Sequence, residues 1–254
     1  MKKIIRLLLL TALFLSGTSV SSQPVKMAVF QLEPFMMKES ETGEITGTAV
    51  EYWKQYLAPK MGIELKIVGL FPALRTINML ETGEIDVIPL LTKIPERAEK
   101  FQYPESLLTK IICCMIVPVN SDYSDPFIIE EYYGKKIAFL EAAFIPDLLI
   151  DDRITFEMVP NEDYRMINLK KLLAGRVDAE LDINYISLLY YLEQNSYFKD
   201  KVRIIMLPVE NEPVYSVFRV TEEGKALQKA FDTANKQGLS EGVFEKMTED
   251  IISE

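Results

Sequence analysis

Histidine is absent from the sequence of 254 residues, and cysteine occurs only twice. Without histidine the chain cannot carry a Ser-His-Asp or Cys-His catalytic set, or a metal site built on histidine. Cys113 and Cys114 are adjacent in a strand-like run, where neighbouring side chains point to opposite faces, so no long-range disulfide forms. We expect small buried apolar thiols, with a strained vicinal disulfide as the alternative. We expect neither a metal nor a cofactor.

The N-terminal apolar run, residues 7–15, is short. Basic residues Lys2, Lys3 and Arg6 precede it, and small residues follow at 16–22. This order predicts a secretory signal peptide over 1–22 and export to the periplasm. A transmembrane anchor is the alternative, but a membrane span needs roughly 20 apolar residues. No cysteine lies near the cleavage zone, which argues against a lipid anchor.

Cations are in deficit, with 28 Lys and Arg against 38 Asp and Glu. Loss of residues 1–22 removes three cations and no acids, which leaves 25 against 38 and a net charge of −13. Such a surface disfavours nucleic acid and anionic membranes as partners. An anionic ligand therefore needs a local basic site.

Apolar periodicity predicts an alternation of strands and helices, and so an α/β protein with mostly parallel sheets covered on both faces. The predicted strands lie at 25–30, 64–68, 85–92, 111–117, 136–140, 154–159, 177–182, 202–207 and 214–220. The predicted helices lie at 48–61, 72–82, 142–150, 162–174, 183–194, 222–236 and 241–252.

A helix-Gly-strand unit occurs at 80–88 and again at 172–181, which indicates two similar lobes. Polar segments at 118–126 and 208–213 bracket the second lobe. We predict that lobe 2, residues 118–213, is inserted into lobe 1, residues 23–117 and 214–254. The chain then crosses twice, which makes a hinge, and a ligand binds in the cleft between the lobes.

One corner of this cleft can bind an anion. The apolar strand ends at Leu91 and Thr92, and a Pro-started turn then brings Arg97. The threonine hydroxyl, backbone N–H groups at the turn and the guanidinium fork together match a carboxylate. A surface arginine with a capping threonine is the alternative.

The whole mature chain resembles the bacterial extracellular solute-binding proteins of family 3, the polar amino-acid receptors of ABC transporters. The marks are Pro34 with Phe35, GTAVEYW at 47–53, GEIDV at 83–87, TKIPERAEKFQYPE at 92–105, GKKIAF at 134–139, GRVDAELD at 175–182 and the closing helices. The resemblance implies the two-lobed periplasmic-binding-protein type II fold. It also implies that Arg97 and Thr92 hold a ligand α-carboxylate.

Other positions depart from the family pattern. The lobe 2 loop after GKKIAF has lost its hydroxyls and carries Glu141 and Phe144. The ammonium-binding acid of the family falls at Ile183, one residue after Asp182, and such a shift in a strand turns the side chain to the other face. Leu32 and Glu33 replace an aromatic shelf.

The second helix begins after Phe71 and carries Arg75 in its first turn. Arg75 either points into the cleft as a second cation or lies solvated on the surface. The acids Glu33, Glu141, Glu180 and Asp182 are candidates near the cleft, and solvated strand-end carboxylates are the alternative for each.

We therefore predict a monomeric, non-enzymatic periplasmic receptor that closes on a small carboxylate-bearing ligand and delivers it to an ABC permease. Phe35 covers the ligand, helped by Phe71 or Phe144. Extra carboxylates suit a ligand with additional positive charge. One alternative is a dehydratase-like enzyme on the same scaffold, with Glu180 or Glu141 as general acid. Another is a receptor that reports to a membrane sensor without transport.

Overall fold

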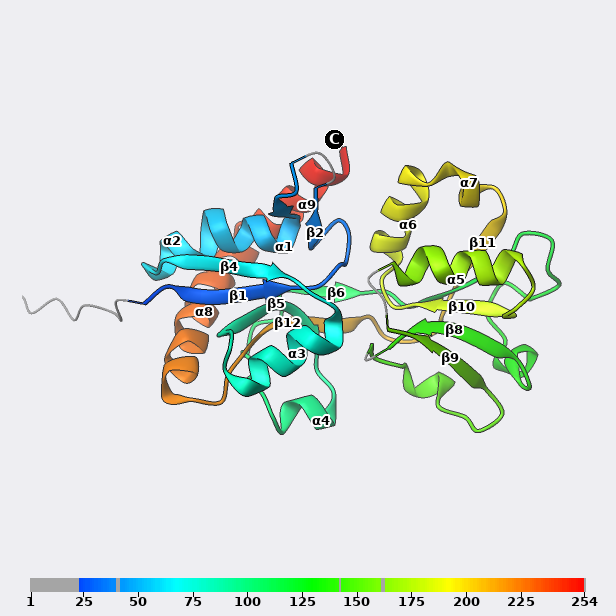
Figure 1. Ribbon diagram of the computed structural model, residues 1–254, viewed down its shortest axis with the longest axis horizontal. Helices are drawn as coiled ribbons and strands as arrows, with labels where there is room; N and C mark the ends of the chain where they lie inside the picture. The colour runs from blue at the N-terminus through cyan, green and yellow to red at the C-terminus, as the bar shows by residue number, and fades with distance from the viewer. Residues whose placement is uncertain (1–22, 40–41, 142, 161–162, 254) are drawn as a thin grey trace, which may run out of the picture.

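The computed structural model describes residues 23–39, 42–141, 143–160 and 163–253. Two lobes lie side by side, each built around its own sheet (Figure 1). The predicted signal peptide, residues 1–22, lies outside the described residues. Within them, no helix is both long and apolar enough to cross a membrane.

The sheet of lobe 1 has the strand order β4-β1-β5-β12-β6. Its strands are β1 (Val25–Val29), β4 (Leu65–Leu70), β5 (Val87–Thr92), β6 (Thr109–Ile111) and β12 (Glu212–Phe218). β1 pairs in parallel with β4 and β5, as successive strands joined by helices require, whereas β12 is antiparallel to β5 and β6. Every residue of β5 is buried, because the strand lies at the centre of this sheet.

The sheet of lobe 2 has the order β11-β7-β10-β8-β9. Its strands are β7 (Cys114–Pro118), β8 (Lys136–Leu140), β9 (Thr155–Val159), β10 (Ala179–Asp182) and β11 (Val202–Met206). Side chains of Cys113 and of β7, which follows it, alternate between two apolar clusters, with Cys113, Met115 and Val117 on one face and Cys114 and Ile116 on the other. Both cysteines are buried and unbridged, which confirms the prediction of small apolar thiols.

Helices cover both lobes. Lobe 1 carries α1 (Thr48–Glu51), a π-helical segment η1 (Tyr52–Leu57), α2 (Ala58–Met61), α3 (Ala73–Thr82), α4 (Pro95–Ala98), α8 (Glu222–Ser240) and α9 (Val243–Ser253). Lobe 2 carries α5 (Tyr164–Leu173), α6 (Tyr185–Gln194), α7 (Ser196–Lys199) and the 3-10 turns η2 (Ile129–Tyr132) and η3 (Asp147–Leu149). Segments α1, η1 and α2 form the continuous helical run predicted over 48–61. Gly62 ends it in the left-handed conformation, at a φ of 65°.

The two predicted crossings are present, but the first lies earlier than the prediction of 118–126. The single strand predicted over 111–117 is divided between the sheets. β6 pairs with β12 in lobe 1, whereas β7 pairs with β10 and β11 in lobe 2, so the crossing lies at residues 112–113. The run reads as one strand because both halves are buried and neither Gly nor Pro separates them. The second crossing, between β11 and β12, agrees with the predicted polar connection.

The helix predicted over 142–150 is wrong. The described part of this segment contains only the short turn η3. Pro146, just before that turn, has an extended ψ of 138°. A proline inside a helix removes a backbone donor and clashes with the preceding turn, so the chain stays irregular here.

Trp53 anchors η1 to the sheet of lobe 1. The Trp53 side chain is completely buried, stacks on Phe231 at 5.5 Å between ring centroids and donates from Nε1 to Ser216 Oγ at 3.0 Å. Ser216 Oγ in turn donates to the carbonyl of Pro89 at 2.8 Å. The tryptophan thus links the helix to two strands, β12 and β5.

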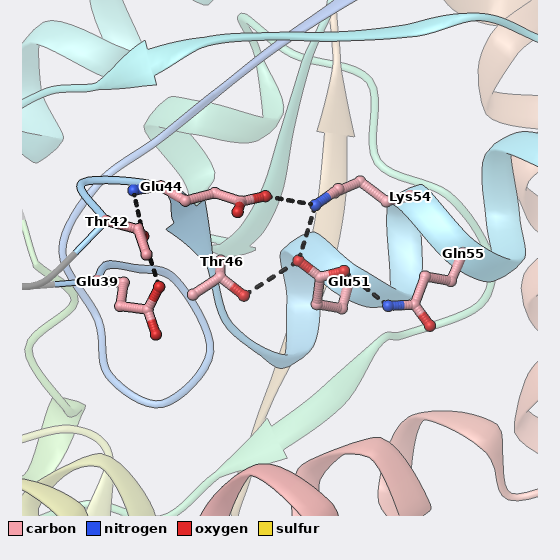
Figure 2. Close-up of polar contacts among 7 residues, drawn as sticks. All are labelled: Glu39, Thr42, Glu44, Thr46, Glu51, Lys54 and Gln55. Atoms are coloured by element: carbon pink, nitrogen blue, oxygen red, sulfur yellow. Dashed lines mark hydrogen bonds and ion pairs between the residues drawn. The ribbon is translucent and has the colours of Figure 1, made fainter.

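A small hairpin, β2 (Met37–Lys38) and β3 (Ile45–Thr46), is tied to the first helical run by side chains (Figure 2). Lys54 Nζ lies 3.2 Å from a Glu44 oxygen and 3.0 Å from a Glu51 oxygen, and Thr46 donates to Glu51 at 3.0 Å. The same hairpin touches lobe 2, where the Tyr190 hydroxyl of α6 lies 4.0 Å from Met37 Sδ.

Replacing Trp53 with Phe should lower the free energy of unfolding by about 2–4 kcal/mol, because it leaves a cavity and an unsatisfied acceptor at Ser216. Tyr56→Phe is a matched control on the same helix, since the Tyr56 hydroxyl bonds an exposed Glu241. It should cost less than about 0.5 kcal/mol. Urea unfolding followed by circular dichroism measures both free energies. Tryptophan fluorescence would not serve, because Trp53 is the only tryptophan and Trp53→Phe removes it. Equal costs for the two variants would contradict the anchoring role.

Candidate functional site

A pocket lies between the lobes, with about 620 Å³ of empty space when the open solvent at its mouth is included. Lobe 1 contributes the ends of β1 and β5, the α3 face at Ala73 and Ile77, and Arg97. Lobe 2 contributes the ends of β8 and β10 and residues of the following loops, among them Phe144 and Asn184. A second pocket of about 370 Å³ adjoins it, since the two share lining residues. A ligand in the main pocket therefore contacts both lobes.

Thr92 and Arg97, predicted as one corner, are adjacent in the main pocket. Arg97 lies in the short helix α4, and its side chain reaches back to the end of β5. Nη1 donates to Thr92 Oγ at 2.7 Å and to the Thr92 carbonyl at 3.2 Å. The Tyr103 hydroxyl donates to the same carbonyl at 2.9 Å. These bonds hold the guanidinium against the strand end.

Arg97 is only 7% exposed, and burial lowers the pKa of its guanidinium. The group nevertheless remains charged, because arginine does not lose its proton in proteins. Its bonds to Thr92 are made with neutral oxygens, which satisfy donors without cancelling the charge. A carboxylate is the group whose geometry and charge complement such a site.

Asp182, at the end of β10, lines the same pocket but is engaged by Arg165 of α5. Oδ2 of Asp182 accepts from Arg165 Nε at 2.9 Å and lies 2.8 Å from Nη2. Oδ1 accepts from the backbone of Asn184 at 2.8 Å, and Arg165 also donates to Ser187 Oγ at 3.2 Å. Burial alone lowers the pKa of Arg165, but the Asp182 carboxylate outweighs it and raises that pKa.

Glu180, two residues earlier on β10, is completely buried. Neither of its oxygens makes a hydrogen bond within the described structure, although Asn168 lies beside it. Burial, followed by the nearby Asp182, raises the pKa of Glu180 well above its ordinary value, and Arg165 and Asn168 oppose this rise only in part. The protonated form is thereby favoured. Glu180 is not among the described residues that line either cleft pocket.

The predicted site residues separate into two groups. Five line the main pocket: Leu91, Thr92, Arg97, Phe144 and Asp182. Glu141 lines the adjoining pocket, together with Gln31, Leu74 and Tyr164. The other group, Phe35, Phe71, Arg75 and Glu33, lies outside the described lining of both.

Each of these four residues makes contacts away from the pocket lining. Phe35 is buried and stacks on Phe244 at 6.3 Å, so it belongs to the core of lobe 1. Arg75 is exposed, and its guanidinium lies 4.6 Å from the centroid of the Phe71 ring. Glu33 accepts from Gln31 at 2.7 Å, yet it also faces lobe 2: the pKa of Tyr190 is raised first by burial and then by Glu33.

Sequence reasoning missed Arg165 and Tyr164. Both lie in α5, where the buried positions include Arg165, Asn168, Leu169 and Leu172, one face of the helix. An arginine on the buried face of a predicted helix is a signal for a buried ionic partner. Among the described residues no group of three or more potential ligands could hold a metal ion.

Comparison with known proteins agrees with this architecture. The sequence profile of "Bacterial extracellular solute-binding proteins, family 3" matches residues 25–253. No curated protein sequence matches at a significant level. A similar solved structure is that of AbpA, an amino acid ABC transporter substrate-binding protein from Streptococcus pneumoniae bound to L-arginine, with 19% identity, 91% of this chain and 94% of that chain covered, and a TM-score of 0.75.

Two further structures are similar. A mutant of ArgBP from T. maritima is 21% identical, covers 91% of this chain and 95% of its own, and has a TM-score of 0.74. A histidine kinase sensor domain with similarity to periplasmic binding proteins is 14% identical, with 90% of this chain and 95% of that chain covered, and has a TM-score of 0.76. At these identities the likeness shows a shared fold, the predicted two-lobed type II arrangement.

The buried carboxyl of Glu180 predicts a pH-dependent loss of stability. The unfolded chain releases this proton near pH 4.5, the ordinary value, whereas the folded chain keeps it to higher pH. Stability should therefore fall as pH rises above about 4.5, by at most about 1.4 kcal/mol per pH unit from this group. Glu180→Gln removes that dependence, so its stability relative to the parent should rise between pH 4.5 and 7.5 in urea unfolding. Glu130→Gln, at an exposed position of lobe 2, is the control and should show a flat difference. A flat difference for Glu180→Gln as well would contradict the raised pKa.

Proposed function

Because this chain belongs to the bacterial extracellular solute-binding proteins of family 3, we propose that it is a periplasmic receptor for a small carboxylate-bearing ligand, an amino acid or a related compound. It closes on this ligand as a monomer and delivers it, unchanged, to an ABC transporter in the membrane. The observation that carries the proposal is the buried guanidinium of Arg97, held on Thr92 inside a pocket that both lobes line.

The chemistry of this corner supports a carboxylate. Arginine has five N–H donors in a planar fork whose geometry matches a planar carboxylate, and the bonds from Nη1 to Thr92 orient this fork at the pocket. The Thr92 hydroxyl accepts from Arg97 and so keeps its own hydrogen for a ligand oxygen. Charge-assisted bonds of this kind are the strong ones, and burial strengthens them further.

Closure follows from the two crossings. Only residues 112–113 and the β11–β12 connection join the lobes covalently, so the lobes can rotate as bodies about these strands. A ligand that contacts both lobes binds the closed arrangement more tightly and shifts the population toward it. A membrane partner can then recognise the closed form.

Two alternative functions are a signalling receptor and an enzyme. Similarity to a histidine kinase sensor domain keeps a signalling role open as a competing proposal, since both roles require only closure. An enzyme would need a general acid at the ligand. Glu180 has a raised pKa but lies outside the described pocket lining, and Glu141 lines only the adjoining pocket, so turnover has less support.

Arg97→Met tests the proposed carboxylate site. A thermal-shift screen against amino acids and small organic acids should give a ligand that stabilises the parent by about 2.7 kcal/mol at 100-fold its Kd, a shift of roughly 5–10 °C. The variant should lose about 2–5 kcal/mol of binding free energy, or at least about 30-fold in affinity. Arg75→Met, which removes an exposed cation stacked on Phe71, should bind as the parent does. A ligand whose shift survives in Arg97→Met would show that the site lies elsewhere.

A further inference from the structure

We infer, on the basis of the proposed function, that the ligand is a monocarboxylate with an uncharged apolar body, and that the Arg165–Asp182 ion pair denies an α-ammonium group a charged partner in this pocket. The proposal concerns the body of the ligand and its second polar group. The carboxylate corner at Arg97 is common to both proposals.

The walls of the main pocket carry the first part of the inference. Polar side chains in its described lining are limited to Thr92, Arg97, Tyr164, Asp182 and Asn184. The remaining lining is apolar and comes from both lobes, for example Phe30, Ile77 and Ile111 from lobe 1 and Phe139, Phe144 and Leu181 from lobe 2. Polar or charged groups placed against such walls lose their water without gaining partners. An aliphatic or aromatic body instead gains stability by leaving water.

The ion pair of Asp182 with Arg165 supports the second part of the inference, that an α-ammonium group finds no charged partner in the pocket. This carboxylate is the acid in the described lining of the main pocket, and its side chain is 1% exposed while that of Arg165 is 6% exposed. Both Asp182 oxygens are already bonded, Oδ2 to Arg165 and Oδ1 to the Asn184 backbone. A ligand ammonium would have to share this carboxylate with Arg165, and it would place a second cation beside a buried guanidinium whose charge Asp182 already balances. Two like charges close together in a buried site are unfavourable.

The neighbouring acids do not replace Asp182. Glu180 is buried, and its surroundings favour its neutral form. Glu33 accepts a bond from Gln31 and lies outside the described pocket lining. Glu141 lines the adjoining pocket, where it can meet only a long ligand that extends out of the main pocket. A cationic tail that reaches Glu141, as in L-arginine, is therefore the competing outcome of the test.

Matched ligand pairs test the inference on the protein purified after export. Isothermal titration calorimetry compares L-phenylalanine with 3-phenylpropanoate, and L-leucine with 4-methylpentanoate, each pair differing only in the α-ammonium group. L-arginine and L-glutamate represent charged side chains. We expect each deaminated acid to bind at least as tightly as its amino acid, and the better of them to bind at least tenfold more tightly than L-arginine or L-glutamate.

A tenfold preference for the amino acid over its deaminated partner, or tightest binding of L-arginine, would overturn the inference. If that binding were lost in Arg97→Met, the proposed receptor function would still stand. If none of these compounds bound, the inference would fail, whereas the receptor function would fail only if the wider screen of amino acids and organic acids also gave no ligand that depends on Arg97. The two failures are therefore distinguishable.

Arg165→Gln tests the role assigned to the ion pair. It leaves the Asp182 carboxylate without its cation, so the affinity ratio within each ligand pair should move at least tenfold in favour of the amino acid. Arg176→Gln, at an exposed position just after α5, is the control and should leave the ratio unchanged. An unchanged ratio in folded Arg165→Gln would contradict this role. If the variant does not fold, the comparison on the parent protein still decides the ligand class.

Discussion

The division of the strands between two sheets is the constraint on which the molecule depends. Among the described residues, the two large sheets share no strand, so each lobe pairs its own strands and builds its own core, with one apolar cluster in lobe 1 and two in lobe 2, one on each face of its sheet. The chain passes between them only at residues 112–113 and after β11. The ends of β5 and β10 consequently face one pocket, and Thr92 and Asp182 meet there although they belong to separate folding units.

In the part of the chain that the structure describes, each lobe buries one arginine, and the two are held by different partners. In lobe 1 the hydroxyl and carbonyl of Thr92, both uncharged, accept from Arg97 and orient its side chain. Lobe 2 gives Arg165 a carboxylate, so that the pair is electrically complete within the lobe. If Arg97 binds the ligand as proposed, the same residue type serves recognition on one side of the cleft and stabilises the fold on the other. The two arginines differ in the groups that bind them, Thr92 for Arg97 and Asp182 for Arg165.

How well the sequence predicted each contact depends on how far apart its residues lie along the chain. Thr92 and Arg97 lie five residues apart in one turn, so local patterning was sufficient to pair them. The first crossing was placed too late because nothing in the composition marks the point where the chain leaves one core and enters the other. Phe35 was assigned to the ligand, but a contact from the far C-terminal helix, Phe244, draws it into the core. The Arg165–Asp182 pair was missed because only tertiary packing brings α5 onto β10.

The adjacent cysteines at the first crossing also constrain how the protein matures. Cys113 and Cys114 face opposite sides of the lobe 2 sheet, and burial raises the pKa of both thiols, to about 12 for Cys113. A protonated, enclosed thiol is a poor nucleophile and exchanges slowly with oxidants. If the chain is exported as proposed, it enters an oxidising compartment with two thiols that are protected only once β7 is in its sheet. In that case lobe 2 must fold before its thiols are oxidised. Enzymes that reduce or rearrange disulfides would then act on the unfolded chain and not on the folded protein.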